Sequence, residues 1–183
     1  MTRRLCSPGI SLLTVALFGV TFLATSSAQD AAPAYELNDH TGQLQRLADY
    51  RGKVVVLNFW ATWCAPCAKE MPIFVDAQKR FGSQGVVVLA ASLDDDETKA
   101  NIPEFMQKRK MNFPVLMGAT AEHLEMFGLQ QALPATVFIN REGQIVSRIL
   151  GEARKGHVFE RIEWLLGRRR NKPPELLDNV PQL

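Results

Sequence analysis

The middle of the chain carries two continuous apolar runs that are typical of strands buried on both faces of a sheet. They cover residues 53–60 and 86–91 and are rich in valine and leucine. Apolar runs without polar alternation predict central strands of the parallel type. Residues 65–81 follow the first run and predict a helix, with Pro66 in its first turn, where a missing N–H is harmless.

The rest of the pattern alternates strands and helices in the order of an α/β domain. The other predicted elements, in chain order, are hairpin strands at 35–37 and 43–47, a helix ending near 110, a strand at 113–117, a helix at 121–127, hairpin strands at 135–139 and 144–149, and a helix at 153–167. The acidic cluster 94–97 is expected to be a solvated helix start rather than a divalent-metal site. We expect residues 29–167 to form one domain, followed by a solvated tail at 168–183.

The first 28 residues differ in character from the predicted domain. Residues 1–4 are basic, residues 10–24 are mostly apolar and residues 25–28 are small, which is the order of an export signal. Counted from Leu5, the apolar stretch reaches the roughly 20 residues of a membrane span, so an uncleaved N-terminal anchor is the alternative. We expect cleavage after Ala28. Both hypotheses place the domain in the periplasm or on the outer side of the cytoplasmic membrane, because the arginines stay on the cytoplasmic side.

Composition and charge exclude several classes of protein. With 183 residues, 46% apolar and 22% charged, the chain is neither a disordered polymer, a multi-pass membrane protein nor a cysteine-rich mini-scaffold. The formal net charge is +2, and Arg3 and Arg4 supply both excess charges, so the chain is neutral from residue 29 onward. A neutral domain lacks the positive field that non-specific nucleic-acid binding requires. We therefore expect no nucleic-acid partner.

Removing the signal, with its Cys6, leaves two cysteines, Cys64 and Cys67. A single pair this close together does not form a structural disulfide framework, because closing so short a loop removes little chain entropy. Its function is therefore expected to be chemical. Cys64 lies at the predicted start of the 65–81 helix, where free backbone N–H groups and the helix dipole favour a thiolate. This position predicts that Cys64 is the nucleophile.

Other uses of a cysteine pair fit the sequence less well. A zinc site would need a second pair of ligands, and the three histidines of the chain are isolated from one another. Covalent haem attachment needs a histidine where Ala68 stands. A copper(I) site on the two thiolates stays open, although the flanking tripeptides contain no histidine or methionine. Redox chemistry without a bound metal or cofactor is the favoured hypothesis.

The cysteine segment resembles a known family. Residues 58–67, Asn-Phe-Trp-Ala-Thr-Trp-Cys-Ala-Pro-Cys, resemble the active-site segment of the thioredoxin superfamily, most closely its TlpA/ResA-like exported branch. Supporting matches at 37–42, 113–116 and 133–140 extend the resemblance over residues 33–167. The resemblance implies a thioredoxin fold of the α/β class: a central mixed sheet flanked by helices, with an N-terminal hairpin and an inserted helix–strand element. The implied activity is thiol–disulfide oxidoreduction without a cofactor.

The resemblance also implies roles for individual residues. Cys64 would attack a substrate disulfide and Cys67 would resolve the mixed disulfide. Glu70 matches a family glutamate beneath the cysteines and would exchange a proton with Cys67, the alternative being an ordinary solvated glutamate in the first helical turn. Two departures from the family pattern stand out. Asn58 occupies the place of thioredoxin's buried aspartate, and Ala135 replaces the usual threonine after the loop proline.

A second group of residues is expected to bind the substrate. Pro134 corresponds to the loop proline that the family holds in the cis form opposite the cysteines, against a base rate of about 5–6% for X–Pro bonds. Leu133 would offer its backbone to a substrate strand. Trp63 would shield one side of the cysteine pair, whereas Trp60 fits either that role or the core.

The direction of electron flow and the partners follow only from the resemblance. That branch is mostly reducing and keeps apocytochrome or copper-site cysteines reduced, so a reductase of protein disulfides is favoured. A membrane thiol transporter would be its electron donor, and the membrane would be contacted only through the N-terminal anchor. The alternatives are a disulfide-forming oxidant and a copper(I)-binding chaperone that uses the same two thiolates.

Overall fold

Strand β3 (Val54–Trp60) forms the centre of the fold, and all of its residues are buried. In the computed structural model, which describes residues 31–169 and 177–179, β3 pairs in parallel with β4 (Val86–Ser92). On its other side it pairs antiparallel with β6 (Ala135–Ile139). The prediction of two central strands from the apolar runs is confirmed.

The main sheet has six strands in the order β5-β4-β3-β6-β7-β8. Strand β5 (Val115–Leu116) runs parallel to β4, and β7 (Ile145–Leu150) runs antiparallel to β6. The chain turns at residues 141–143 between β6 and β7. Gly143 has a φ of 73° there, a conformation that glycine adopts without strain. Strand β8 (Leu177–Asn179) adds to β7 in parallel. The sheet is therefore mixed, as the predicted fold class requires.

Strand β8 lies in the segment that was expected to be a solvated tail. The backbone of Leu177–Asn179 pairs with Arg148, Ile149 and Leu150. Three residues are too few to show a periodic pattern, so the sequence gives no sign of this strand. Part of the predicted tail therefore covers the edge of the sheet.

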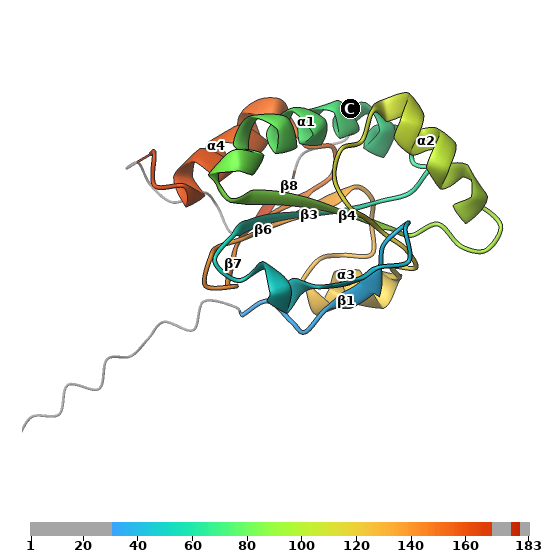
Figure 1. The fold of residues 1–183 in the computed structure, drawn as a ribbon, viewed down its shortest axis with the longest axis horizontal. Helices are drawn as coiled ribbons and strands as arrows, with labels where there is room; N and C mark the ends of the chain where they lie inside the picture. Colours follow the sequence, from blue (N-terminus) through green and yellow to red (C-terminus); the bar gives the residue numbers. More distant parts are fainter. Residues whose placement is uncertain (1–30, 170–176, 180–183) are drawn as a thin grey trace, which may run out of the picture.

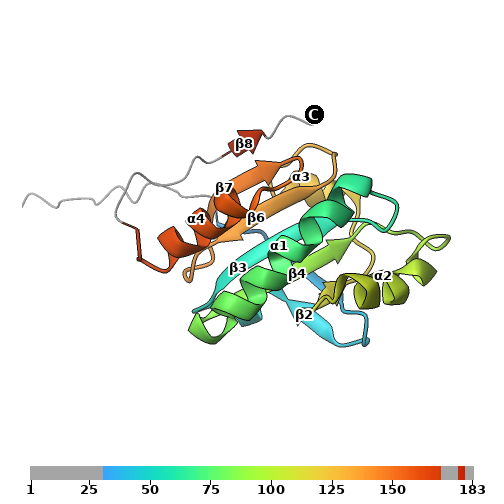
Figure 2. The ribbon, with the colours of Figure 1, turned by 90° about the horizontal axis from the view of Figure 1, so that it is seen from above.

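Helices cover both faces of the sheet. Helices α1 (Ala65–Phe81), α2 (Ile102–Arg109) and α4 (Lys155–Leu165) lie on one face, while α3 (Ala121–Met126) and the hairpin of β1 (Glu36–Asn38) and β2 (Leu44–Arg46) lie on the other (Figure 1). Figure 2 shows α1 running across the sheet between α4 and α2. Three 3-10 helices, η1 (Leu47–Tyr50), η2 (Gly82–Gln84) and η3 (Lys99–Asn101), lie in the connections. None of the described helices is long and apolar enough to span a membrane.

The alternation of β3 divides the core between the two faces. Val54, Val56 and Trp60 pack in the cluster beneath α1, whereas the odd-numbered Val55, Leu57 and Phe59 pack with the α3 side. Since side chains alternate along a strand, the polar Asn58 belongs to the α1 face together with its even-numbered neighbours. The buried face of α1 adds Met71 and Phe74 to the same cluster. This layer is where the cysteine pair lies.

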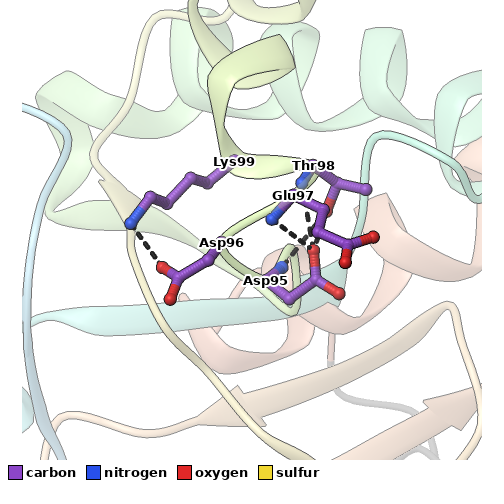
Figure 3. Close-up of polar contacts among 5 residues, drawn as sticks. All are labelled: Asp95, Asp96, Glu97, Thr98 and Lys99. Carbon is purple, nitrogen blue, oxygen red and sulfur yellow. Dashed lines mark hydrogen bonds and ion pairs between the residues drawn. The ribbon is translucent and has the colours of Figure 1, made fainter.

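The prediction that the acidic cluster at residues 94–97 forms the start of a helix is wrong. Helix α2 begins only at Ile102, and the acids lie in the preceding loop. The Asp95 carboxylate accepts bonds from the backbone N–H groups of Glu97 and Thr98 and from the Thr98 hydroxyl (Figure 3). A short acidic side chain that satisfies its own loop competes with the helical backbone, which explains the later helix start.

Candidate functional site

The two cysteines form a disulfide at the N-terminus of α1, with their Cα atoms 5.3 Å apart. Cys64 is the N-cap residue, and its Sγ accepts the backbone N–H of Cys67 at 3.3 Å. Pro66 lies in the first turn, as predicted. Free N–H groups directed at this sulfur favour its thiolate form once the disulfide is reduced. The predicted place of the pair, between strand and helix, is confirmed.

The two cysteines differ in their access to the surface. Cys67 is fully buried, and 5% of Cys64 is exposed in this disulfide form. Cys64 lines a surface pocket of about 480 Å³, and the residues around it are Trp63, Ala65, Pro66, Leu93, Ala121, Leu124, Gln131 and Leu133. Cys67 is not part of this lining. A molecule that enters the pocket therefore meets Cys64.

The predicted substrate-binding residues gather at the same pocket. The Leu133–Pro134 peptide bond is cis, as predicted, and both Leu133 and Cys64 line the pocket. Trp63 is 61% exposed, an unusual state for a tryptophan, and lies on the wall next to Cys64. Trp60, by contrast, is fully buried, and its ring centroid is 4.7 Å from that of Phe105, so it belongs to the core.

Glu70 is fully buried one turn after Cys67 on the same helix. The alternative of an ordinary solvated glutamate is therefore wrong. Its Oε1 accepts the Asn58 side-chain amide at 2.8 Å, and its Oε2 accepts the Ala153 backbone N–H at 2.6 Å. Burial raises the pKa of Glu70 to about 8, because the two hydrogen bonds only partly offset the loss of water around the charge.

The departures from the family pattern meet at this carboxyl group. Asn58 comes from the centre of β3 and donates from the same amide to the Thr136 hydroxyl at 3.1 Å. The hydroxyl expected after the loop proline is thus supplied by the residue that follows Ala135. Asn58 stands where the family pattern has a buried acid, so the Glu70 carboxyl group accepts a hydrogen bond from a neutral amide there.

Sequence reasoning missed a second buried carboxylate, Asp94. It was expected to be solvated with the rest of the acidic cluster, but only 6% of it is exposed. Its carboxylate accepts the Thr62 backbone N–H at 2.9 Å, the Thr62 hydroxyl at 2.5 Å and the Ser92 hydroxyl at 2.6 Å. Ser92 is two residues from Asp94, but Thr62 is 32 residues away, and only the pairing of β3 with β4 brings it close. No local pattern could have separated Asp94 from its exposed neighbours.

Within residues 31–169 and 177–179, no group of three or more histidine, cysteine, aspartate or glutamate side chains is arranged to hold a metal ion.

Residues 28–148 match the model of the AhpC/TSA family. The thiol-disulfide oxidoreductase ResA of Bacillus subtilis (strain 168) is 35% identical over 165 residues, covering 86% of this chain and 90% of the relative. ResA of Geobacillus thermodenitrificans (strain NG80-2) is 34% identical over 161 residues, covering 84% and 91%. The chain belongs to the AhpC/TSA family. Its similarity to the ResA proteins and its cysteine pair make it a thiol-disulfide oxidoreductase.

Similar solved structures confirm the thioredoxin fold. A thiol:disulfide interchange protein of Chlorobium tepidum TLS is 29% identical, with a TM-score of 0.63 over 75% of this chain and 96% of that one. The exposed lipoprotein thioredoxin of Streptococcus pneumoniae strain TIGR4 is 29% identical, with a TM-score of 0.62 over 72% and 99%. The fold class expected from the resemblance is therefore confirmed.

The buried Glu70 predicts a specific dependence of stability on pH. The pKa of Glu70 is about 8 in the folded state against an ordinary value of 4.5, so unfolding at a pH between these two values releases its proton. Its contribution to the free energy of unfolding therefore falls as the pH rises through this window, by up to about 1.4 kcal/mol per pH unit. We expect Glu70→Gln to remove this fall, as measured by urea denaturation at pH 5 and pH 8 with the disulfide intact.

The exposed Glu142 provides a matched control, because Glu142→Gln removes the same charge from the hairpin turn. This variant should keep the pH dependence of the wild type. If Glu70→Gln also keeps it, Glu70 titrates as an ordinary carboxyl group and the assignment is wrong.

Proposed function

We propose that this enzyme is an exported reductase of protein disulfides that works through the Cys64/Cys67 dithiol. The observation that carries the proposal is the asymmetry of the pair. Cys64 lines an open pocket at the N-terminus of α1, while Cys67 is buried behind it within disulfide distance. One sulfur is thus placed to meet a substrate, and the other to resolve the product.

The reaction proceeds in two exchanges. The Cys64 thiolate attacks one sulfur of the substrate disulfide, a Cys64–substrate bond forms, and the other substrate sulfur leaves as a thiolate that takes up a proton. Cys67 then loses its proton and attacks the Cys64 sulfur. The Cys64–Cys67 bond forms, and the second substrate thiolate is released and protonated. The substrate gains two electrons and two protons, and proximity makes the second exchange effectively unimolecular.

Glu70 is proposed to take the proton of Cys67 in the second exchange. Both residues are fully buried and lie three positions apart on α1, on one face of the helix. A thiol has an ordinary pKa of about 8.5, and burial disfavours its ionisation, so a base in the interior is needed. Burial raises the pKa of Glu70 to about 8, near the ordinary value of a thiol. A base whose pKa lies near the working pH is suited to proton transfer.

The pocket around Cys64 is proposed to bind an extended segment of the substrate protein. The half-buried Leu133 lies across the pocket from the cysteine and would offer backbone hydrogen bonds, with Pro134 fixing the loop. The exposed ring of Trp63 would cover apolar side chains next to the substrate cysteine. Backbone recognition tolerates many sequences, which suits an enzyme with protein disulfides as substrates.

The charge distribution supports the reducing direction. Strong oxidants owe their potential to a stabilised reduced form, with a thiolate of very low pKa. Here every residue lining the Cys64 pocket is uncharged, including Ala65 and Pro66 between the cysteines. The helix N-terminus stabilises the Cys64 thiolate, while Glu70, once ionised, adds negative charge beneath the pair. The dithiol is therefore stabilised only modestly, so it gives up electrons readily.

Export and the partners complete the proposal. Residues 1–28 have the pattern of a signal, with cleavage after Ala28 or retention as an anchor. Ala31 already bridges to Gln144, so the folded domain begins directly after the proposed signal. Each turnover leaves the enzyme oxidised, and a membrane thiol transporter would return its electrons. Disulfides formed during cytochrome c or copper-site maturation are the proposed substrates.

Variants of the two cysteines test their roles. In Cys67→Ser the first exchange proceeds but the second cannot, so we expect this variant to accumulate covalent complexes with substrate proteins in the native envelope. These complexes should appear on non-reducing gels and disappear after reduction. The matched control Cys64→Ser lacks the attacking sulfur and should trap none. Equal trapping by both variants would show that the assignment of attacking and resolving cysteines is wrong.

A pH titration of the reduced enzyme tests the role of Glu70. The rate of Cys67 alkylation should reflect two coupled ionisations in the wild type, because Cys67 and Glu70 titrate as a pair. In Glu70→Gln we expect a single ionisation, whereas Glu142→Gln should keep both. An alkylation profile unchanged by Glu70→Gln for both cysteines would remove Glu70 from the mechanism.

A further inference from the structure

Asp94 is a buried carboxylate that the proposed mechanism does not use. Within the described part of the chain, its oxygens accept hydrogen bonds from two hydroxyls and one backbone amide, and no cation pairs with it. A buried charge is costly unless its hydrogen-bonding capacity is filled. Asp94 is therefore held in a place that few other side chains could occupy.

The three bonds to Asp94 use both of its carboxyl oxygens. Its Oδ1 accepts the Thr62 hydroxyl, and its Oδ2 accepts both the Thr62 backbone N–H and the Ser92 hydroxyl. An asparagine with its oxygen at the place of Oδ2 would keep two of these contacts, and its NH₂ group would donate to the Thr62 hydroxyl oxygen, which is also an acceptor. An alanine offers none of these atoms, so it removes the link between Thr62 and the end of β4.

The Asp94 bonds connect the segments that follow the parallel strands β3 and β4, beyond the last paired residues of these strands. Trp60 and Ser92 are the last paired residues of β3 and β4, and the Leu93 N–H still donates to the Trp60 carbonyl at 2.8 Å. Beyond this point the two backbones separate. The Asp94 side chain then bonds Thr62 in the turn that leads from β3 into α1, and so joins this turn to β4.

The turn held by Asp94 carries the reacting sulfur. Thr62 lies two residues before Cys64, and the Cys64 N–H donates to the Ala61 carbonyl at 3.2 Å across the same turn. Trp63 and Cys64 line the pocket from this turn, whereas Leu133 lines it from the loop before β6. Other parts of the pocket wall come from Leu93, directly after β4, and from α3. The position of the turn relative to these segments sets how a bound substrate disulfide meets the sulfur.

We propose that Asp94 is a positioning residue for disulfide exchange, holding the turn of residues 61–64 so that Cys64 and Trp63 face Leu133 across the pocket. This role rests on the proposed function, in which Leu133 binds the substrate that Cys64 attacks. Attack on a disulfide depends on alignment, and a displacement of about 1 Å at a reacting centre is enough to slow a reaction by as much as about 100-fold. Loss of the Asp94 bonds should therefore affect a substrate held by the pocket more than a small reagent.

The experiment compares two reactions of Cys64 in a Cys67→Ser background. One is mixed-disulfide formation with an extended peptide that contains a disulfide, and the other is alkylation by iodoacetamide. We expect Asp94→Ala to lower the rate constant with the peptide by about tenfold and that of alkylation by less than about twofold. Asp95→Ala is the matched control, because the Asp95 side chain bonds only to its own loop (Figure 3), and it should leave both rates unchanged.

Each outcome decides the proposal. A selective loss with the peptide supports positioning. Unchanged rates with both reagents would show that Asp94 acts on stability alone, and an equal fall in both would show an effect on thiolate ionisation; either result overturns the proposal. If the Asp94 variant does not fold, Thr62→Val and Thr62→Ser replace it. The first loses the hydroxyl bond and should show the selective fall, and the second keeps that bond and should match the parent protein.

The parent Cys67→Ser protein separates this proposal from the proposed function. If it forms no mixed disulfide with any disulfide peptide, the reductase mechanism is wrong. If it reacts and Asp94→Ala reacts equally well, only the positioning role is lost.

Discussion

The passage from a fully buried strand into the N-terminus of a helix is the constraint on which the rest of the site depends. Because β3 is buried on both faces, the chain can reach the surface only at the end of the strand, and α1 starts there. The first turn of a helix leaves backbone N–H groups unpaired, and one of them is directed at the sulfur of Cys64. The same few residues thus fix the place of the cysteine and the electrostatics around it.

The helix then separates the environments of the two cysteines. Cys64 caps α1 and lines the pocket, whereas Cys67 and Glu70 follow at helical spacing and point into the layer beneath it. The burial that protects Cys67 from solvent also raises the pKa of Glu70. The same packing therefore makes the Cys67 thiol hard to deprotonate and gives Glu70 the raised pKa of a suitable base. Asn58 and the Ala153 backbone hold that base from a strand and from the loop before α4. The chemistry therefore depends on contacts between elements that are distant in sequence.

The sequence predicted the features whose signals lie within a few neighbouring residues or in a motif, but not the contacts that depend on how the strands pair. The apolar run of β3, the helix with its early Pro66 and the cis bond at Pro134 all have signals within a few residues or in a family motif, and the structure confirms them. The contacts of Asp94 with Thr62 depend on the parallel pairing of β3 with β4, which no composition or periodicity reveals. Strand β8 was missed because three residues form no pattern. Glu70 lies between these cases: its spacing from Cys67 was visible, but its burial was not.

The reduction potential of the Cys64/Cys67 couple tests the central claim of a reductase most directly. It would be measured by equilibrating the purified enzyme with dithiol and disulfide buffers of known potential and quantifying the free thiols. An uncharged pocket above a buried carboxyl group should give a potential near that of thioredoxin, about −270 mV. A value near that of a strong oxidant, about −120 mV, would mean that the dithiol is strongly stabilised, and it would contradict the account.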